Sequence, residues 1–424
     1  MLSLAVGLLT AGILTLVLQV FFHVMRAASS PPNPISPTTS VSPSGETCRT
    51  AQLPNAARLG NVAWVSDGAL MQVELGSCRQ TVLMGSDAAP PVRFSHDGQW
   101  VALGDGQVLP AAGGSAVQPL GSVRSWEWSP TDDVLAAVTA TGGVTIGGPG
   151  LAINELLPEG SGVGHLAFSP NGRYLAVDVR RVGVQVLAVA TGKAETVFHE
   201  TDPARVPEVA GWTPDARWVL YWRGPVGEDG PIDAAPASGG DWVNVFDPVL
   251  PYRDFLSACG SSIALVAGSG LDVSTGKQIL LSGPPDWNFH DLTNDFSRSW
   301  IWPACSPNGR WLAASDTFSQ SETANDTIPR ALWLLATDGS SRRLLISGGK
   351  GAIEFPRWSS DGTVILVVRR SGNRWASNGS LLLAQIDPGS GKLVKLVGPI
   401  ADLGSAPGPG GHQLWSEISD WYRP

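Results

Sequence analysis

The stretch Phe94-Ser-His-Asp-Gly-Gln-Trp-Val-Ala-Leu103 joins an aromatic anchor, a tight turn and a short run of strand-forming residues. Close variants follow five further anchors along the chain, at Trp128, Phe168, Trp212, Cys305 and Trp358. The turn contains Asp or Asn in all six copies, Pro in four and Gly in four. Pro fixes φ, Asp or Asn caps the turn, and Gly accepts a positive φ. Each copy therefore predicts one β-hairpin.

The spacing of the anchors indicates how these hairpins are assembled. Most neighbouring anchors lie 34 to 53 residues apart, which leaves room for four short strands and their turns. The interval from Trp212 to Cys305 is 93 residues, and a decayed copy at 258–267 keeps the strand but has lost the turn. Since one hairpin cannot bury its own faces, repeats of this length predict a ring or array of sheets.

The copies resemble the repeats of TolB-type, WD-like β-propellers, as does Leu332-Trp-Leu-Leu-Ala-Thr-Asp-Gly-Ser-Ser-Arg-Arg-Leu-Leu345. The resemblance spans residues 58–421 and implies an all-β propeller. Seven internal repeat units and one unit shared between the two ends predict about eight four-stranded blades. Seven blades are the alternative, because residues 212–305 could form one blade with a long insert. Such propellers host scaffolds, sensors, peptidase accessory domains and some enzymes, so the resemblance implies no single activity.

The two ends of the repeat region complement each other. Residues 61–66, 69–75 and 80–84 predict three strands with no anchor strand before them, and residues 413–421 look like an anchor strand with no blade after it. We expect the C-terminal strand to complete the N-terminal blade, which leaves no open sheet edge. The propeller domain is therefore expected over residues 58–424.

The N-terminal segment has a different composition. Residues 1–25 contain no formally charged side chain before Arg26, and they are long enough to cross a bilayer core of about 30 Å. We predict a transmembrane anchor at residues 1–26. A cleaved signal peptide is the alternative, which the long apolar run and the missing basic n-region disfavour. The Pro/Ser/Thr-rich character of residues 27–57 predicts a semi-extended spacer.

The chain has four cysteines, Cys48, Cys78, Cys259 and Cys305, and none lies in a Cys-x-x-Cys pair. Order along the repeats suggests the disulfides Cys48–Cys78 and Cys259–Cys305, with four free thiols as the alternative. Disulfides require an oxidising compartment. They predict a propeller outside the cytoplasm, periplasmic or at the cell surface, although Arg26 after the apolar segment weakly favours the opposite orientation.

Composition and motifs exclude several classes of function. A net charge of −9 and an isoelectric point near 5.2 argue against nucleic acid as a partner. The sequence contains no G-x-S-x-G, H-E-x-x-H, Walker A or EF-hand pattern. No two of the six histidines are spaced as metal ligands, so we predict neither a metal site nor a cofactor. Several of the seventeen Trp are repeat anchors, which predicts that most of them pack between blades.

Two segments depart from the repeat enough to form a binding site. The first is the aromatic and polar segment 286–302, and its candidate recognition residues are Trp287, Phe289, His290, Asp291 and Arg298. The alternative is that its aromatic residues fill a junction between blades. The second is a basic turn at 369–375, and its candidates for contact with a carboxylate, a phosphate or a glycan are Arg369, Arg370, Arg374 and Trp375. The alternative is a solvated hairpin.

These observations predict a membrane-anchored, extracytoplasmic propeller that acts as a non-catalytic binding or scaffold module for a protein, a peptide or a cell-envelope polymer. One alternative is a hydrolase or lyase with its site in the central funnel, since residues from different blades can converge without a sequence motif. Another alternative is a sensor or accessory subunit of a membrane complex.

Overall fold

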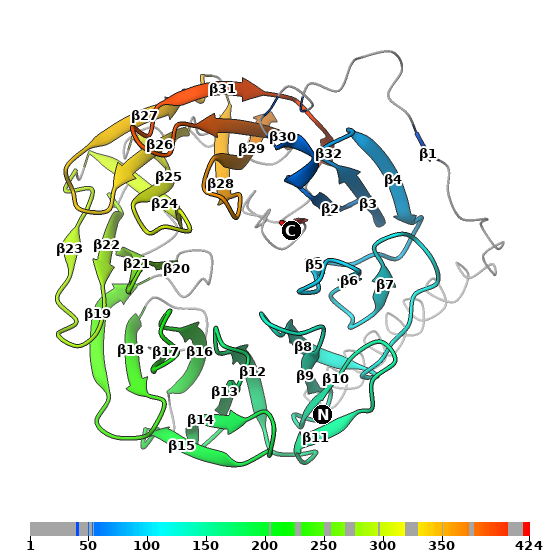
Figure 1. Ribbon diagram of the computed structural model, residues 1–424. Coiled ribbons are helices and arrows are strands. Elements are labelled where there is room, and N and C mark those ends of the chain that lie inside the picture. Colours follow the sequence, from blue (N-terminus) through cyan, green and yellow to red (C-terminus); the bar gives the residue numbers. More distant parts are fainter. Residues whose placement is uncertain are drawn as a thin grey trace, which may run out of the picture. The chain divides into compact units, whose positions relative to one another are not determined.

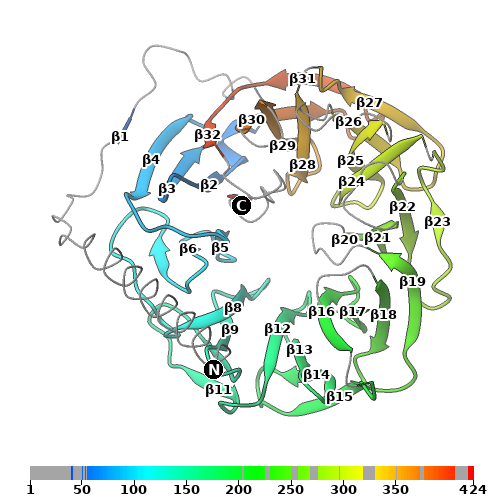
Figure 2. The same cartoon turned by 180° about the vertical axis from the view of Figure 1, so that it is seen from behind.

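The strands of the repeat region form a ring of small antiparallel sheets (Figures 1 and 2). The computed structural model describes residues 40–41, 50, 53, 55–202, 205–224, 230–249, 256–267, 276–295, 297–318, 330–349, 351–372, 377–405 and 419–424. The predicted anchor at residues 1–26 and nearly all of the predicted spacer lie outside these ranges. Among the residues described, no helix has the length and apolar composition needed to cross a bilayer.

In each blade the strands follow one another from the centre of the ring outward. Blades 1 to 4 contain β2 (Asn61–Ser66), β3 (Ala69–Glu74) and β4 (Arg79–Met84); β5 (Arg93–Phe94), β6 (Trp100–Ala102) and β7 (Val108–Pro110); β8 (Val123–Trp128), β9 (Leu135–Thr139), β10 (Val144–Gly147) and β11 (Asn154–Leu157); and β12 (Val163–Phe168), β13 (Tyr174–Val179), β14 (Gly183–Ala188) and β15 (Ala194–His199). A short 3-10 turn, η2 (Ala56–Arg58), precedes blade 1.

The second half of the ring repeats this order. Blades 5 to 8 contain β16 (Val206–Trp212), β17 (Trp218–Gly224), β18 (Gly230–Pro236) and β19 (Val243–Val249); β20 (Leu256–Cys259), β21 (Ser262–Ala267), β22 (Gln278–Ser282) and β23 (His290–Asp291); β24 (Arg298–Cys305), β25 (Trp311–Phe318), β26 (Ala331–Ala336) and β27 (Arg342–Ile346); and β28 (Ala352–Trp358), β29 (Val364–Gly372), β30 (Ser377–Ile386) and β31 (Leu393–Val397). A further strand, β32 (Asp402–Ser405), also pairs with β30.

The expected number of eight blades is confirmed. Residues 212–305 supply two blades, because the decayed copy at 258–267 forms the hairpin β20–β21 with its own strands β22 and β23. One residue pair, Val249 with Ala267, links blades 5 and 6 into a continuous sheet. Blade 2 departs from the four-stranded pattern: it has three strands, and an isolated bridge from Val108 to Val117 stands at its outer edge.

The two ends of the described chain meet in blade 1. The last strand, β33 (Ser419–Tyr422), pairs antiparallel with β2, with Ser419 opposite Trp64 and Tyr422 opposite Asn61. It is therefore the inner strand of blade 1. At the outer edge of the same blade, β1 (Ser40–Val41) pairs with β4.

The repeated turn is built by local hydrogen bonds. In blade 7 the Ser306 hydroxyl donates to Oδ1 of Asn308 at 2.8 Å and accepts from the Trp311 amide at 3.0 Å. The Asn308 oxygen also accepts from the amide of Arg310, and Gly309 has a φ of +68°. Equivalent bonds occur at Ser95 and Asp97, Ser169 and Asn171, Thr213 and Asp215, and Ser359 and Asp361. These bonds explain why the motif starts the second strand in blades 2, 4, 5, 7 and 8.

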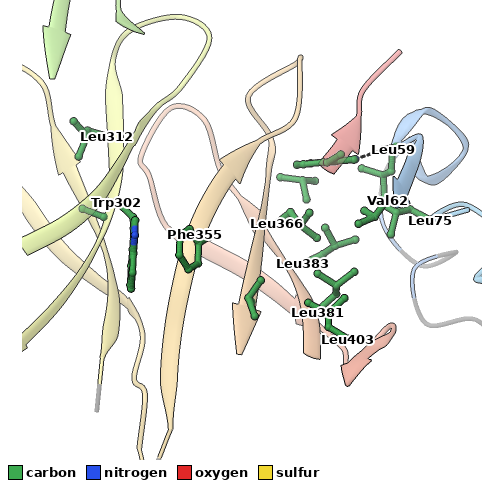
Figure 3. Close-up of a cluster of buried hydrophobic side chains, with 14 of the residues drawn as sticks. Leu59, Val62, Leu75, Trp302, Leu312, Phe355, Leu366, Leu381, Leu383 and Leu403 are labelled. Atoms are coloured by element: carbon green, nitrogen blue, oxygen red, sulfur yellow. Dashed lines mark hydrogen bonds between the residues drawn. The ribbon is translucent and has the colours of Figure 1, made fainter. Parts of the chain in front are cut away.

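The core of the ring lies between the blades. Each neighbouring pair encloses buried apolar side chains, and one cluster runs from Trp302 and Phe355 through the leucines of blade 8 to Leu59 and Val62 of blade 1 (Figure 3). The anchors Trp128, Trp212 and Trp358 are buried. Their indole N–H groups donate to carbonyls on the inner strand of the preceding blade, those of Arg93, Ala167 and Ala304. These three anchors are packing residues, as the sequence indicated.

The predicted disulfide Cys259–Cys305 is confirmed. It joins β20 to β24, the inner strands of blades 6 and 7, with 5.2 Å between the two Cα atoms. Cys78 is also disulfide-bonded. Its expected partner Cys48 lies outside the described residues.

Ala216 occupies the turn position that Gly takes in four other blades, and its φ is +58°. A side chain in this left-handed region costs roughly 1–2 kcal/mol, and a Gly loses about 0.5–1 kcal/mol more chain entropy on folding than Ala does. We expect Ala216→Gly to raise the free energy of unfolding by about 0.5–1 kcal/mol, seen as a higher urea midpoint at unchanged m value. As a control, Gly309→Ala should destabilise, because its Cβ would lie 3.0 Å from the Gly260 Cα. An unchanged or lower midpoint for Ala216→Gly would contradict this account.

Candidate functional site

The antiparallel order of the strands divides the loops between two faces of the ring. The turns from the inner to the second strand and from the third to the outer strand share one face, here called the turn face. The links from the second to the third strand, and from one blade to the next, share the opposite face, here called the crossover face. Polar and aromatic side chains lie on both faces. They line two grooves on the turn face and form networks of paired charges on the crossover face.

On the turn face, a groove of about 710 Å³ lies between blades 4 and 5. We call it the aromatic groove; its lining includes Tyr174, Trp218, Lys193, Glu195 and Arg217. Tyr174 is 38% exposed, whereas Trp218 is partly buried. A volume of this size is in the range of small-molecule and peptide sites, which combine apolar walls with a few polar groups.

The repeat itself positions the exposed ring of the aromatic groove. Tyr174 is the first residue of β13, where the turn hydroxyl of Ser169 accepts a hydrogen bond from its amide at 3.0 Å. Its ring stacks on the anchor Trp212 of the next blade, with 6.5 Å between the ring centroids and 27° between the planes. The Trp212 indole is in turn fixed by its bond to the Ala167 carbonyl. The exposed face of Tyr174 therefore rests on a buried, oriented support.

A second groove on the turn face, of about 500 Å³, lies between blades 6 and 7. We call it the polar groove; Asp286, Asn288 and His290 of the predicted segment line it together with Thr337 and Asp338 of blade 7. Hydrogen bonds from the Ser340 side chain and amide lower the pKa of Asp338, which keeps this carboxyl ionised. The groove thus presents two carboxylates and one imidazole.

The two aromatic candidates of the predicted segment, Trp287 and Phe289, do not line that groove. Trp287 is buried and packs edge-to-face against Trp218 at 5.3 Å between centroids, so it fills the junction of blades 5 and 6. Phe289 is 58% exposed and touches Phe246. Asp291 accepts hydrogen bonds from the amides of Thr293 and Asn294, and so caps a local turn.

Arg298 lies on the crossover face, within a network of paired charges. Its guanidinium bonds to Asp316, lies 3.5 Å from a carboxylate oxygen of Asp295, and stands 5.0 Å from the ring centre of Trp333. The Trp333 indole donates to the other oxygen of Asp316 at 2.6 Å. Burial raises the pKa of the Asp316 carboxyl, and the hydrogen bond and charge of Arg298 oppose that rise. These contacts connect three strands of blade 7.

The candidate residues of the basic turn at 369–375 also lie in different environments. Arg369 is exposed, whereas Arg370 is buried and donates to Oε1 of Glu354 at 3.1 Å. Arg374 and Trp375 lie outside the described residues. The structure therefore brings Arg370 to an acidic partner from the neighbouring strand β28.

A histidine that the sequence did not single out lies between blades 4 and 5. His165 is on the inner strand β12; its Nδ1 is 3.1 Å from Oδ2 of Asp178, and its Nε2 is 3.8 Å from Oε1 of Glu208. Asp178 is buried, and it also accepts from the amides of Gly164 and Val209. A buried carboxylate at Nδ1 orients an imidazole and leaves Nε2 as its basic nitrogen. The signal in the sequence is Asp178 itself, an acid inside the apolar run 175–179.

The structure contains no candidate metal centre among the residues that it describes. No group of three or more His, Cys, Asp or Glu side chains there is arranged to hold an ion.

Comparison with known proteins supports the fold. No protein-family model and no curated protein sequence matches the chain. A solved prolyl endopeptidase is similar at 11% identity and a TM-score of 0.50, over 82% of this chain and 51% of that one. The chain thus spans about half the length of that enzyme.

TolB proteins are also among the similar solved structures, as the sequence resemblance led us to expect. TolB from Agrobacterium tumefaciens is 15% identical with a TM-score of 0.36, over 64% of this chain and 94% of that one. A manganese complex of oligogalacturonate lyase is 12% identical with a TM-score of 0.46, over 76% and 80%. At these identities the likeness shows the propeller fold alone, and that fold hosts both binding and catalysis.

The raised pKa of Asp316 gives a pH dependence with a definite sign. A carboxyl whose folded-state pKa lies above 3.8 stabilises the fold most below that pH, and this contribution is lost as the pH rises through the folded pKa. Relative to Asp316→Asn, we expect wild type to lose stability from acidic to neutral pH in urea unfolding. Asp338→Asn is the control, because the lowered pKa of Asp338 predicts the opposite slope. If wild type instead gained stability relative to Asp316→Asn over this pH range, the interaction with Arg298 would outweigh the effect of burial on the pKa of Asp316.

Proposed function

We propose that this protein is an extracytoplasmic, non-catalytic propeller that binds a protein, a peptide or a cell-envelope polymer on its turn face. The aromatic groove carries the proposal, because it combines an exposed ring on a fixed support with charged groups of both signs. Aromatic side chains in such positions dominate the binding energy of many interfaces. Lys193, Glu195 and Arg217 would orient a ligand whose apolar part covers Tyr174.

The cysteines support an extracytoplasmic location. The disulfide Cys259–Cys305 joins two neighbouring blades, and Cys78 is also oxidised. Stable disulfides form in secreted and periplasmic proteins and are rare in a reducing cytosol. They support a propeller held outside the cytoplasm by the predicted anchor at residues 1–26, with the predicted spacer between them.

The test is capture of a ligand by the full-length protein in its own membranes, using mild crosslinking followed by mass spectrometry. We expect a reproducible ligand that Tyr174→Ala reduces about tenfold or more, as for an aromatic hot spot. Leu151→Ala is the matched control, since Leu151 is also exposed, at 52%, but lies in blade 3 away from both grooves.

Two further variants separate the grooves. The double variant Asp286→Ala and Asp338→Ala is compared with Tyr174→Ala. If the double variant abolishes capture and Tyr174→Ala does not, the ligand binds in the polar groove and the choice of the aromatic groove is wrong. If all variants capture as well as wild type, or wild type captures nothing, the binding proposal fails.

A second candidate is an enzyme, a hydrolase or lyase, and one observation favours it. His165 has the arrangement of a general base: Nδ1 is held by the buried Asp178, and the imidazole remains partly exposed on an inner strand. Positioned proton transfer of this kind contributes about 10²–10⁴-fold to a reaction rate. The substrate would be a peptide or polymer that reaches the inner strands of blades 4 and 5.

This candidate predicts that purified wild type cleaves envelope extracts or peptide libraries, with products detected by mass spectrometry. His165→Ala should then lower the rate at least about 100-fold. His199→Ala, at an exposed histidine of β15, should leave it unchanged. Cleavage that survives His165→Ala would come from elsewhere, and absence of any wild-type product would reject the candidate.

A further inference from the structure

The predicted spacer contains a run of regularly spaced prolines. Residues 31–37 read Pro-Pro-Asn-Pro-Ile-Ser-Pro, with proline at every third position, at Pro31, Pro34 and Pro37. A polyproline II helix has three residues per turn, so these three prolines would form one stripe along its side. No charged residue occurs between positions 27 and 45. The segment lies outside the described residues, and its sequence predicts an uncharged ligand for a proline-binding groove.

The aromatic groove has the walls that such a ligand requires. Proline-rich segments in the polyproline II conformation dock into grooves lined by aromatic rings. Tyr174 offers one ring, 38% exposed and stacked on Trp212. Trp218 offers a second ring, which is held edge-to-face against Trp287. Pro236 and three alanines add apolar surface between the rings and the charged rim.

The two rings also carry hydrogen-bond donors. In the part of the chain that the structure describes, neither the Tyr174 hydroxyl nor the Trp218 indole N–H bonds to another group. A polyproline II segment has no internal hydrogen bonds and proline has no N–H, so its carbonyls remain free to accept. The ligand therefore brings acceptors to a groove that supplies donors.

The charges around the groove cancel. Lys193 and Glu195 stand two residues apart at the start of the outer strand β15, and Arg217 lies 3.9 Å from a carboxylate oxygen of Asp215. These four side chains supply two positive and two negative charges. A neutral segment is thus a better electrostatic match than an acidic or a basic polymer.

The position of β1 decides which copy of the chain supplies the segment. β1 pairs with β4 at the outer edge of blade 1, across the ring from the aromatic groove (Figures 1 and 2). Pro37 precedes Ser40 of β1 by three residues, which span at most about 11 Å when extended. The five-stranded sheet of blade 1 is itself about 19 Å wide, at about 4.8 Å per strand spacing. Pro37 therefore cannot reach the groove of its own chain.

We propose that the aromatic groove of one copy of this protein binds the proline stripe, residues 31–37, of a second copy. The inference rests on the proposed function, because it uses the same groove and names its ligand. Segment and groove are different surfaces, so the contact is of the head-to-tail type. Copies held in one membrane by their predicted anchors would meet at a high effective concentration.

The test places the photo-crosslinker p-benzoylphenylalanine at Ser238, an exposed residue of the groove, in the full-length protein reconstituted in vesicles. This copy also carries Pro31→Ala, Pro34→Ala and Pro37→Ala, and a second copy with a different tag has the native segment. We expect crosslinks between the two tags, with the junction located in residues 29–38 by mass spectrometry. The same three substitutions in the second copy should lower the yield at least about tenfold. Pro43→Ala, in the same spacer but outside the segment, is the control and should leave the yield unchanged.

The spacer substitutions change no residue of the propeller, so a loss of crosslinks through them does not reflect misfolding of the groove. Tyr174→Ala in the copy with the crosslinker should lower the yield to the same extent, and Leu151→Ala should not. Equal yields with native and substituted segments, or a junction outside residues 29–38, overturn the proposal. A crosslink that forms only when segment and crosslinker belong to one copy overturns it as well.

The outcomes also separate this inference from the proposed function. If capture of another ligand in the native membranes still depends on Tyr174, while no crosslink depends on the prolines, the groove binds something else. The proposed function then stands and the inference is wrong. If neither capture nor crosslinking depends on Tyr174, both are wrong.

Discussion

No blade of this ring can bury its own faces, and in blades 3, 5 and 8 the contact that joins a blade to the preceding one is the tryptophan anchor at the end of its inner strand. A buried indole fills the apolar space between two blades, and its N–H also finds a specific acceptor on the neighbour. Trp212 donates to the Ala167 carbonyl at 3.0 Å, and Trp358 donates to the Ala304 carbonyl at 2.9 Å. The hydrogen bond fixes the angle of packing, while burial supplies most of the stabilisation.

The same logic closes the ring. Asp420, on the last strand, accepts from the Phe94 amide of blade 2 at 2.8 Å and pairs with Arg357 of blade 8 at 3.4 Å. One carboxylate thus touches the blades on both sides of the strand that carries it. The disulfide between Cys259 and Cys305 joins blades 6 and 7, where the repeat of blade 6 has lost its turn motif. A covalent link therefore stands where the noncovalent repeat has decayed.

The fold could be predicted from the sequence because its determinants are local. The hydroxyl of Ser306 bonds partners two and five residues along the chain, and such contacts are visible in any copy of the motif. The candidate sites could not be predicted in the same way. Arg298 is a candidate recognition residue in the sequence, but the register of strands β24 and β25 places Asp316 beside it. Trp287 is a candidate of the same kind, but it fills the junction between blades 5 and 6. The partners come from neighbouring strands and blades, at separations that follow no repeat.

One signal could have found those sites, namely a charged residue inside an apolar strand. Asp178 stands in β13, Asp233 in β18 and Arg370 near the end of β29, among residues whose neighbours are mostly buried. A charge in such a place is costly unless an adjacent strand supplies a partner. Asp233 has Arg223 at 2.6 Å and Asn244 at 2.8 Å, and Asp178 has His165. Arg370 donates to the Glu354 carboxylate at 3.1 Å, so each of these three charges has a partner from an adjacent strand.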